Sequence, residues 1–459
     1  MKLKKLTLAN FRGFDQIDLD FEDDLTVIAG VNGVGKSGVL KALAALLSHA
    51  LPRVCVSAEK PQNLAVTDVQ LNKAALSISC SLELNNARLN ASILRSAPIG
   101  PEESKELVEK RTQLRNEFRY TEKKSEEALK IEDQIKLIEQ RLAEPTDLPT
   151  VNLLPGDNIS VEDYKSVANG ATAQPIAVFY STSRLLSRIG PRLPPVADVF
   201  MSTAYNNALS QSEVSLYEFA SWFRAVSEGA IQLPSLSGKL LELIEATLKQ
   251  FLPEMSSLEL HTDGQPQFSL QKNGRRLYLW QLSDGEQGIL ALALDLLRRL
   301  AIANPFAENP VKTGLAVVLI DEIELHLHPS WQRRVIRLLQ NAFTQCQFIV
   351  TTHSPQVIGQ VRPQKMRLLH HDDSCKVVRA PVSQSFGMDS SWVLQNIMGV
   401  PARDYETEQR LSAIYDEIDA NRMDLARTLA AELKAEIGDF PDLQEAIALL
   451  DRFALLRDQ

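Results

Sequence analysis

The sequence has few cysteines, no long apolar run and no excess of positive charge. Its four cysteines, Cys55, Cys80, Cys346 and Cys375, are scattered and form no Cys-x-x-Cys pair. This excludes a disulfide-stabilised scaffold and a cysteine-built zinc site. No apolar run reaches the roughly 20 residues that span a bilayer, and the first residues do not have the pattern of a signal peptide. We therefore expect a soluble cytoplasmic protein without a membrane anchor.

The charge balance argues against a chain that binds nucleic acid through its overall field. The sequence contains 49 Lys and Arg against 58 Asp and Glu, which gives a net charge of −9. Residues 403–459 hold 14 acids and 7 bases, so −7 of this charge lies in the C-terminal tail. With 459 residues, of which 44% are hydrophobic, the chain is long enough for several domains with sizeable cores.

Apolar patterning predicts an α/β head that is interrupted by a helical insertion. Short or continuous apolar runs indicate strands at 3–9, 17–21, 25–29, 175–180, 315–320 and 348–352. Residues 102–144 contain 12 acids and 10 bases with neither Gly nor Pro, and their two apolar seams are out of phase around 121–129. One long helix or two helices meeting at a bend fit this pattern equally well. Because its charges nearly balance, this arm is expected to be solvated and not to grip DNA.

The rest of the chain divides into a linker, a second part of the head and a helical tail. Residues 145–174 are rich in Pro, Gly and Asp and are expected to be a linker. Helical spacing in the tail is expected at 406–420, 423–437 and 443–456, with Gly438 at a C-cap position. The predicted domains are the first part of the head at 1–95, the arm and linker at 96–174, the second part of the head at 175–385, and the acidic helical tail at 386–459.

A phosphate-binding loop follows the apolar run at 25–29. The segment reads Gly30-Val31-Asn32-Gly33-Val34-Gly35-Lys36-Ser37, a full match to G-x-x-x-x-G-K-S between a buried strand and a helix. Its backbone N–H groups would surround the phosphates of ATP, with Asn32, Gly33, Val34 and Gly35 forming the turn. Lys36 would reach the β- and γ-phosphates, and the Ser37 hydroxyl would bind Mg²⁺.

Two acidic residues end the apolar run at 315–320. A carboxylate at the tip of a buried strand is costly unless a cation or water meets it, so Asp321 is the expected second Mg²⁺ ligand. Glu322 would then be the general base that polarises the attacking water.

Two further motifs are interpreted together with the phosphate loop and the acidic pair. The segment Leu282-Ser283-Asp284-Gly285-Glu286-Gln287 precedes an apolar helical run, and Ser283 or Asp284 can cap that helix. It resembles the signature motif of ATP-binding-cassette ATPases, in which the serine and Gly285 would contact ATP. His353 ends the strand at 348–352 and resembles the switch histidine of the same ATPases, which contacts the γ-phosphate.

The order of the four motifs resembles the ATP-binding-cassette superfamily, and the long gap before the signature resembles its structural-maintenance, RecF and overcoming-lysogenization branch. This resemblance implies a mostly parallel sheet flanked by helices, with antiparallel N-terminal strands. It also implies that Arg12 approaches the phosphates and that a glutamine links nucleotide to the arm, for which Gln70 and Gln62 are the two candidates. In this superfamily two heads enclose two ATP molecules, so Ser283 would serve the partner's site. Residues 324–329 would face the partner.

Among members of this branch, the chain resembles the ATPases of the Septu antiphage system and of some retron systems. The tail lacks the strands and acidic motif of a topoisomerase-primase nuclease domain. The resemblance therefore implies an ATPase that forms a homodimer or a higher even oligomer and works with a separate HNH endonuclease, with DNA bound through the complex. The alternatives are a DNA-repair ATPase of the RecF or Rad50 kind that binds duplex DNA, and an ATP-gated scaffold with little turnover.

Overall fold

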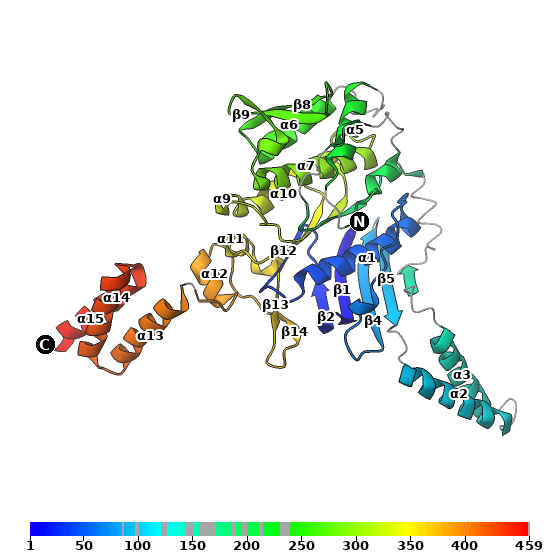
Figure 1. Ribbon diagram of the computed structural model, residues 1–459, viewed down its shortest axis with the longest axis horizontal. Helices are drawn as coiled ribbons and strands as arrows, with labels where there is room; N and C mark the ends of the chain where they lie inside the picture. Colours follow the sequence, from blue (N-terminus) through cyan, green and yellow to red (C-terminus); the bar gives the residue numbers. More distant parts are fainter. Residues whose placement is uncertain are drawn as a thin grey trace. The chain divides into compact units, whose positions relative to one another are not determined.

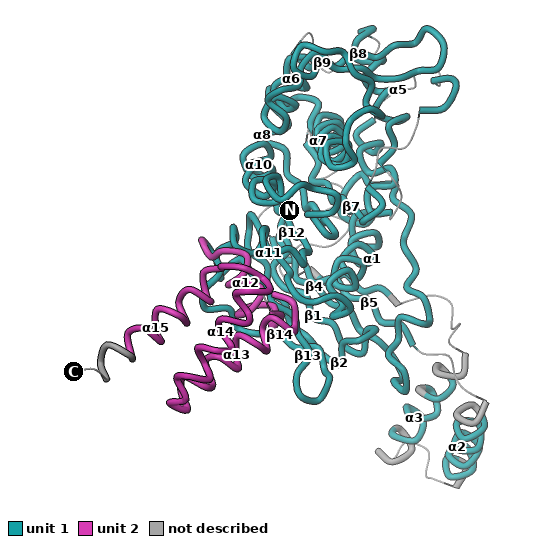
Figure 2. The backbone as a smooth tube through the Cα atoms, turned by 60° about the vertical axis from the view of Figure 1, so that its left-hand side comes forward, with its two compact units in different colours: residues 1–386 teal, residues 387–459 magenta. Residues whose placement is uncertain are grey.

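The computed structural model describes two compact units, residues 1–386 and 387–459 (Figure 2). It describes the chain except for 85–86, 97–100, 121–125, 144–149, 156–169, 172, 185–188, 194–199, 211–213, 230–238, 402 and 458–459. No described helix combines the length and the apolar character needed to cross a membrane.

The first unit is built around a six-stranded, mostly parallel sheet (Figure 1). Its strands, in spatial order, are β14 (Val377–Ala380), β13 (Met366–His371), β3 (Leu25–Gly30), β12 (Gln347–Thr352), β11 (Ala316–Ile320) and β7 (Ile176–Tyr180). Only β14 is antiparallel to its neighbour. Every residue of β3, β7, β11 and β12 is buried, as their continuous apolar runs predicted.

A five-stranded antiparallel sheet lies against the same core. Its order is β2 (Phe14–Asp20), β1 (Lys2–Phe11), β4 (Ala75–Leu84), β5 (Ala87–Ser96) and β6 (Thr150–Pro155). Helix α1 (Lys36–Val54) contacts strands of both sheets, and its buried residues fill the space between them. The predicted N-terminal strand pair and the α/β head are thereby confirmed.

The prediction that 145–174 is a linker is wrong at β6. Residues 150–155 pair with β5 along its free edge, from Leu94 opposite Thr150 to Leu89 opposite Pro155. The short apolar run Val151-Asn152-Leu153-Leu154 pairs with β5 on one side, and Pro155 is tolerated because it ends an edge strand. A composition rich in turn formers concealed this strand.

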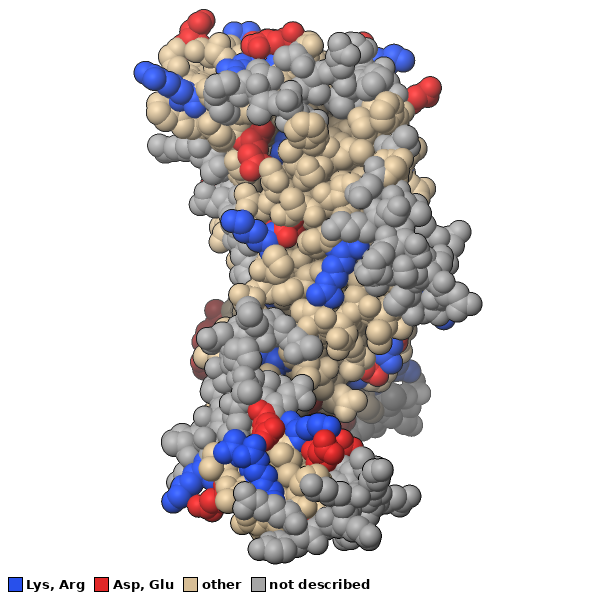
Figure 3. Space-filling view, turned by 90° about the vertical axis from the view of Figure 1, so that its right-hand side faces the viewer, with Lys and Arg blue, Asp and Glu red and all other residues tan. Residues whose placement is uncertain are grey.

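The insertion forms two helices, α2 (Pro101–Tyr120) and α3 (Glu126–Ala143), which lie side by side (Figures 1 and 2). Of the two alternatives for this segment, the structure has two helices. Leu114 and Ile138 are buried, and Arg115 forms an ion pair with Glu139 across the pair. On the described surface that Figure 3 shows, Lys/Arg and Asp/Glu side chains are interspersed over this arm, with neither sign gathered into a patch.

Between residues 216 and 278, just before the signature segment, the first unit contains a three-stranded antiparallel sheet and two amphipathic helices. The elements are α5 (Leu216–Ser227), α6 (Leu240–Phe251), β8 (Met255–His261), β9 (Gln267–Lys272) and β10 (Arg275–Tyr278). Phe219 and Phe223 of α5 pack against Phe268 of β9, with ring centroids 5.5 and 5.4 Å apart. This core supports helix α7 (Asp284–Ala303), which contacts both α5 and α6.

The remaining described elements of the first unit are short. They are the helices α8 (Pro310–Thr313), α9 (Pro329–Gln332), α10 (Val335–Ala342) and α11 (Pro355–Ile358), and the 3-10 turns at Val66–Asp68, Met201–Tyr205, Leu279–Gln281 and Pro363–Lys365.

The regular elements described in the second unit are all helices, which confirms the predicted helical tail. They are α12 (Ser390–Asn396), α13 (Tyr405–Asp419), α14 (Met423–Ile437) and α15 (Pro441–Arg457). Helix α14 has the predicted bounds, and Gly438 follows it with φ 93°, a conformation that glycine adopts readily. The last three helices share a core that includes Ile414, Leu433 and Leu443.

Candidate nucleotide-binding site

Three neighbouring strands bring the phosphate loop, the acidic pair and His353 to the same end of the parallel sheet. Strands β3, β12, β11 and β7 are adjacent and parallel, so their carboxyl ends lie side by side. The phosphate loop follows β3, His353 follows β12, and the acidic pair follows β11. In open α/β sheets, ligands bind at this edge. The sheet order therefore gathers motifs that are up to 317 residues apart, as for Lys36 and His353 (353 − 36).

The phosphate loop turns tightly between β3 and α1. Gly33 and Gly35 have φ angles of 83° and 99°, and a Cβ on Gly35 would lie 2.6 Å from the ring of Phe14. Asn32 and Gly33 are exposed at the tip, whereas Val34 is buried beneath it. The loop thus leaves its backbone N–H groups and the start of α1 open to an anion.

The Lys36 side chain lies back along its own loop. Its Nζ donates hydrogen bonds to the carbonyl oxygens of Gly30 and Val31, at 2.8 and 2.9 Å. Burial lowers the pKa of the ammonium, and nearby carboxylates, Glu324 foremost, oppose this effect. A buried cation held by neutral carbonyls is well suited to bind phosphate oxygens.

Ser37 and Asp321 meet, as predicted for two ligands of one metal ion. The Ser37 hydroxyl donates to Asp321 Oδ1 at 2.9 Å, and the Thr351 hydroxyl donates to the same oxygen at 2.6 Å. Asp321 is buried. Hydroxyl and carboxylate oxygens are the donors that Mg²⁺ prefers, so this pair fits the ion.

Glu322 has an unusual backbone conformation. Its φ is 46°, in the left-handed region that non-glycine residues rarely adopt. Its N–H donates to the Thr351 hydroxyl at 2.7 Å, and its carbonyl accepts from Arg184 at 2.6 Å. Arg184 also donates to the carbonyl of Asp321 at 2.6 Å. Sequence reasoning missed Arg184 and Thr351; a basic residue four positions after an apolar strand was the available signal for the first.

His353 lies against a buried carboxylate that the sequence analysis had placed only in the partner-facing segment. Glu324 Oε1 accepts the backbone N–H of His353 at 2.6 Å, and His353 Nδ1 is 3.0 Å from the same oxygen. The Glu324 side chain is 5% exposed, whereas that of His353 is 40% exposed. The buried Glu324 therefore orients His353 through these contacts and leaves the imidazole ring accessible.

Arg12 lies beside the start of α1, close to the phosphate loop. It has φ 52° in the turn between β1 and β2, and its Nε donates to Asp68 at 2.8 Å. A Cβ on Gly38 would lie 3.8 Å from the Arg12 side chain. This placement agrees with an approach to the phosphates.

The two candidate linking glutamines have other partners. The Gln70 side-chain amide donates to Asp15 at 2.6 Å, and that of Gln62 donates to the carbonyl of Leu209. Within the described part of the chain, neither is hydrogen-bonded to residues 30–37. Gln70 is held near the turn that contains Arg12, since the backbone N–H of Gln70 donates to the carbonyl of Asn10. Whether either glutamine contacts nucleotide stays a prediction.

The signature segment forms the N-terminus of α7. Ser283 is the N-cap: its hydroxyl accepts the N–H of Glu286 and donates to the Glu286 carboxylate at 2.9 Å. Gly285 packs against residues 324–329, since a Cβ there would lie 2.5 Å from the carbonyl oxygen of His326. Among the described residues, no hydrogen bond or ion pair joins 282–287 to the phosphate loop. The described contacts of Ser283 therefore lie within its own helix N-terminus and do not include Lys36.

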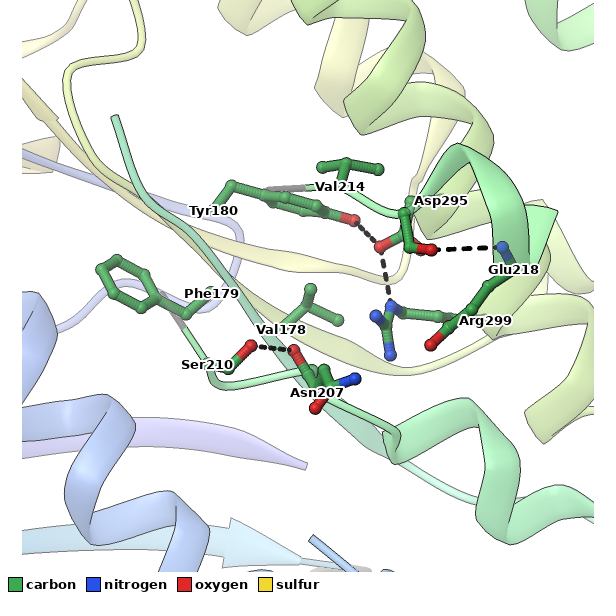
Figure 4. A pocket seen from close by; sticks show the side chains of 11 residues that line it. Val178, Phe179, Tyr180, Asn207, Ser210, Val214, Glu218, Asp295 and Arg299 are labelled. Carbon is green, nitrogen blue, oxygen red and sulfur yellow. Dashed lines mark hydrogen bonds and ion pairs between the residues drawn. The ribbon is translucent and has the colours of Figure 1, made fainter. Parts of the chain in front are cut away.

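A buried ionic network ties α7 to β7. Asp295 of α7 accepts hydrogen bonds from the Tyr180 hydroxyl at 3.0 Å, from Arg298 at 3.0 Å and from Arg299 at 2.7 Å. Figure 4 shows Tyr180 and Arg299 pointing toward Asp295. These three residues line a cavity of about 40 Å³. Burial alone would raise the pKa of Asp295, but the two guanidinium groups lower it to about 2. Since the carbonyl of Tyr180 accepts the N–H of Asp321 at 2.8 Å, this network borders the acidic pair.

Known proteins resemble this chain along most of its length. The "Retron Ec83 probable ATPase" of Escherichia coli is 27% identical over 98% of this chain and 86% of its own length. The "Septu protein PtuA" of Bacillus thuringiensis is 21% identical over 87% of this chain and 84% of its own length. A solved SMC head bound to the C-winged helix domain of ScpA covers 83% of this chain and 98% of its own, with 14% identity and a TM-score of 0.46.

A family model described as "AAA domain, putative AbiEii toxin, Type IV TA system" matches residues 25–359. The match begins at β3 and includes the phosphate loop, the signature segment, the acidic pair and His353. Because it spans well over half of the sequence, the chain belongs to this family of AAA ATPase domains.

Proposed function

We propose that this chain hydrolyses ATP at a site shared between two copies and serves as the ATPase subunit of an antiphage defence complex. The observation that carries the proposal concerns the described polar contacts of the site residues. Lys36, Asp321 and Glu322 gather at one sheet edge, while Ser283 caps a helix that has no polar contact with them in the described chain. A second copy would supply the missing Ser283.

Each residue has a role that follows from its surroundings. Lys36 and the N-terminus of α1 bind the phosphates, and Ser37 with Asp321 would hold Mg²⁺, which supplies charge neutralisation at the β- and γ-phosphates when bound. Glu322 accepts the proton of the attacking water, and His353 donates a hydrogen bond toward the γ-phosphate. Ser283 and the N-terminus of the partner's α7 complete the enclosure and stabilise the charge that develops on the transferred group.

A mixing experiment tests the shared site directly. The variants Lys36→Ala and Ser283→Arg should each hydrolyse ATP poorly on their own. In a mixed dimer, one site combines both defects and the other has a wild-type Lys36 and a wild-type Ser283. Random pairing makes half of the dimers mixed, so the equimolar mixture should recover about a quarter of wild-type activity.

The control is a mixture of Lys36→Ala with a Lys36→Ala, Ser283→Arg double variant, in which every site lacks a functional lysine. Recovery in the test mixture alone supports the shared site. If the test mixture stays as inactive as the control, each chain holds a complete site and the proposal fails.

The partner is proposed to be a separate HNH endonuclease, with DNA bound through the complex. The likeness to a Septu protein and a retron ATPase supports this step. The second unit is the proposed dock, because residues 403–459 carry 14 acids against 7 bases and would attract a basic nuclease. Deleting 387–459 should leave ATP hydrolysis intact and abolish co-purification with the endonuclease. Undiminished capture by the shortened chain would exclude this dock.

A further inference from the structure

We propose that Arg184 is a positioning residue for hydrolysis: it holds the backbone of Asp321 and Glu322 so that the Glu322 carboxylate faces the attacking water. This inference rests on the proposed ATP hydrolysis with Glu322 as base. Arg184 lies outside the phosphate loop, the signature segment and the segment around His353. It follows β7, the last of the parallel strands in the sheet order.

Among the described residues, the hydrogen bonds of Arg184 all go to main-chain carbonyls. One guanidinium nitrogen donates to the carbonyl of Asp321 at 2.6 Å and to that of Ser181 at 3.4 Å, and the other donates to the carbonyl of Glu322 at 2.6 Å. The side chain is buried, with a residue exposure of 6%. Arg184 thus bridges the end of β7 to two consecutive peptide groups beyond β11.

This bridge acts where the backbone most needs support. Glu322 has φ 46°, which places its side chain in a direction that ordinary extended or helical backbone would not give. Such a conformation persists only when the surroundings over-determine it. The hydroxyl of Thr351 fixes the N–H of Glu322, and Arg184 fixes its carbonyl, so the peptide groups on both sides are held.

The charge of Arg184 suits its position. Burial lowers the pKa of the Arg184 guanidinium, and the nearby carboxylates of Glu324, Asp321 and Glu322 oppose this effect. The guanidinium therefore offsets part of the negative charge at the end of β11 without competing with Lys36 for the phosphates. Its rigid fork can reach both carbonyls at once, which the single ammonium of a lysine cannot do with the same geometry.

The experiment compares Arg184→Ala and Arg184→Lys with Arg192→Ala, an exposed arginine of the same connecting segment. Phosphate release at saturating ATP, KM and the affinity for a fluorescent ATP analogue are measured on the full-length chain. A displaced base should lower kcat on the order of ten- to a hundred-fold for Arg184→Ala, with KM and analogue affinity within about threefold of wild type. Arg184→Lys should lie between, and Arg192→Ala should match wild type.

A double variant separates positioning from a general structural role. If Arg184 acts through Glu322, adding Arg184→Ala to Glu322→Gln should slow single-turnover hydrolysis no further than Glu322→Gln alone. A further loss as large as that of the single Arg184→Ala variant would overturn the inference. So would an unchanged kcat in Arg184→Ala, or a loss of analogue affinity that accounts for the lost rate.

The inference and the proposed function fail in different ways. A wild-type chain that releases no phosphate refutes both. A wild-type chain that hydrolyses ATP while Arg184→Ala hydrolyses it equally fast refutes only the role of Arg184. If Arg184→Ala does not fold, as judged by gel filtration and urea unfolding, the decision passes to Arg184→Lys, for which wild-type kcat would overturn the inference.

Discussion

Replacing Asp295 by asparagine should destabilise the first unit, because it removes an anion that two buried arginines share. The side chains of Asp295, Arg298 and Arg299 are only 5%, 5% and 7% exposed. Asparagine keeps the shape and one acceptor oxygen, so the volume of the core does not change. What is lost is the charge that offsets Arg299 and that, together with Glu218, offsets Arg298 in a medium of low dielectric constant.

Two estimates bound the size of the effect. A pKa that falls from 3.8 in the unfolded chain to about 2 in the folded one corresponds to roughly 2 kcal/mol of stabilisation by the ionised carboxylate. Breaking a buried ion pair by removing one partner typically costs about 3–5 kcal/mol. We therefore expect Asp295→Asn to lower the free energy of unfolding by about 2–5 kcal/mol at neutral pH.

The lowered pKa of Asp295 also determines how its contribution to the free energy of unfolding depends on pH. Because the folded pKa lies below the unfolded one, the stabilisation by Asp295 is fully present above about pH 4 and is lost as the pH falls toward 2. The wild-type chain and Asp295→Asn should therefore differ most at neutral pH and converge in acid.

Urea unfolding followed by tryptophan emission measures this difference, since Trp222 of the adjoining helix α5 is buried. The matched control is Asp263→Asn, an exposed acid in the turn between β8 and β9 of the same unit. The reasoning is refuted if Asp295→Asn and the control have the same urea midpoint at pH 7, or if the difference between them grows as the pH is lowered.

Two further predictions concern α7 and the cysteines. In the absence of nucleotide, Gly285→Ala should lower the free energy of unfolding by about 1–3 kcal/mol, because its Cβ would meet the carbonyl of His326. The control Gly288→Ala, which has open space around it, should raise the free energy of unfolding by up to about 1 kcal/mol. Urea midpoints that move in the same direction for both variants would contradict the close approach of Gly285 to His326. A thiol reagent at pH 8 should label Cys375 alone in the folded chain and all four cysteines in urea, because burial raises the pKa of the other three thiols to about 12. The labelled thiols are counted by mass spectrometry. Rapid labelling of more than one thiol in the folded chain would show that one of the three buried cysteines is accessible.

Much of this protein follows from short stretches of sequence. The phosphate loop lies between a buried strand and a helix because glycines at 33 and 35 permit positive φ and an apolar run precedes them. Ser283 caps α7 through Glu286 three residues later, and α14 ends at Gly438, each by a rule that acts within one helical turn. Such features are local, so the loop and the end of α14 were predicted from short segments, and Ser283 was one of the two residues predicted to cap α7.

Only the tertiary structure decided which distant groups meet. Strand β6 gains its hydrogen bonds from β5, more than fifty residues earlier, so its own composition did not reveal it. Arg184 became a partner of Asp321 and Glu322 because β7 and β11 are neighbours in the sheet, and main-chain carbonyls leave no pattern in the sequence. Glu324 came to lie beneath His353 for the same reason, since β11 and β12 are adjacent. Local rules determine elements, whereas strand order, which is set by packing over the whole core, determines the chemistry at their ends.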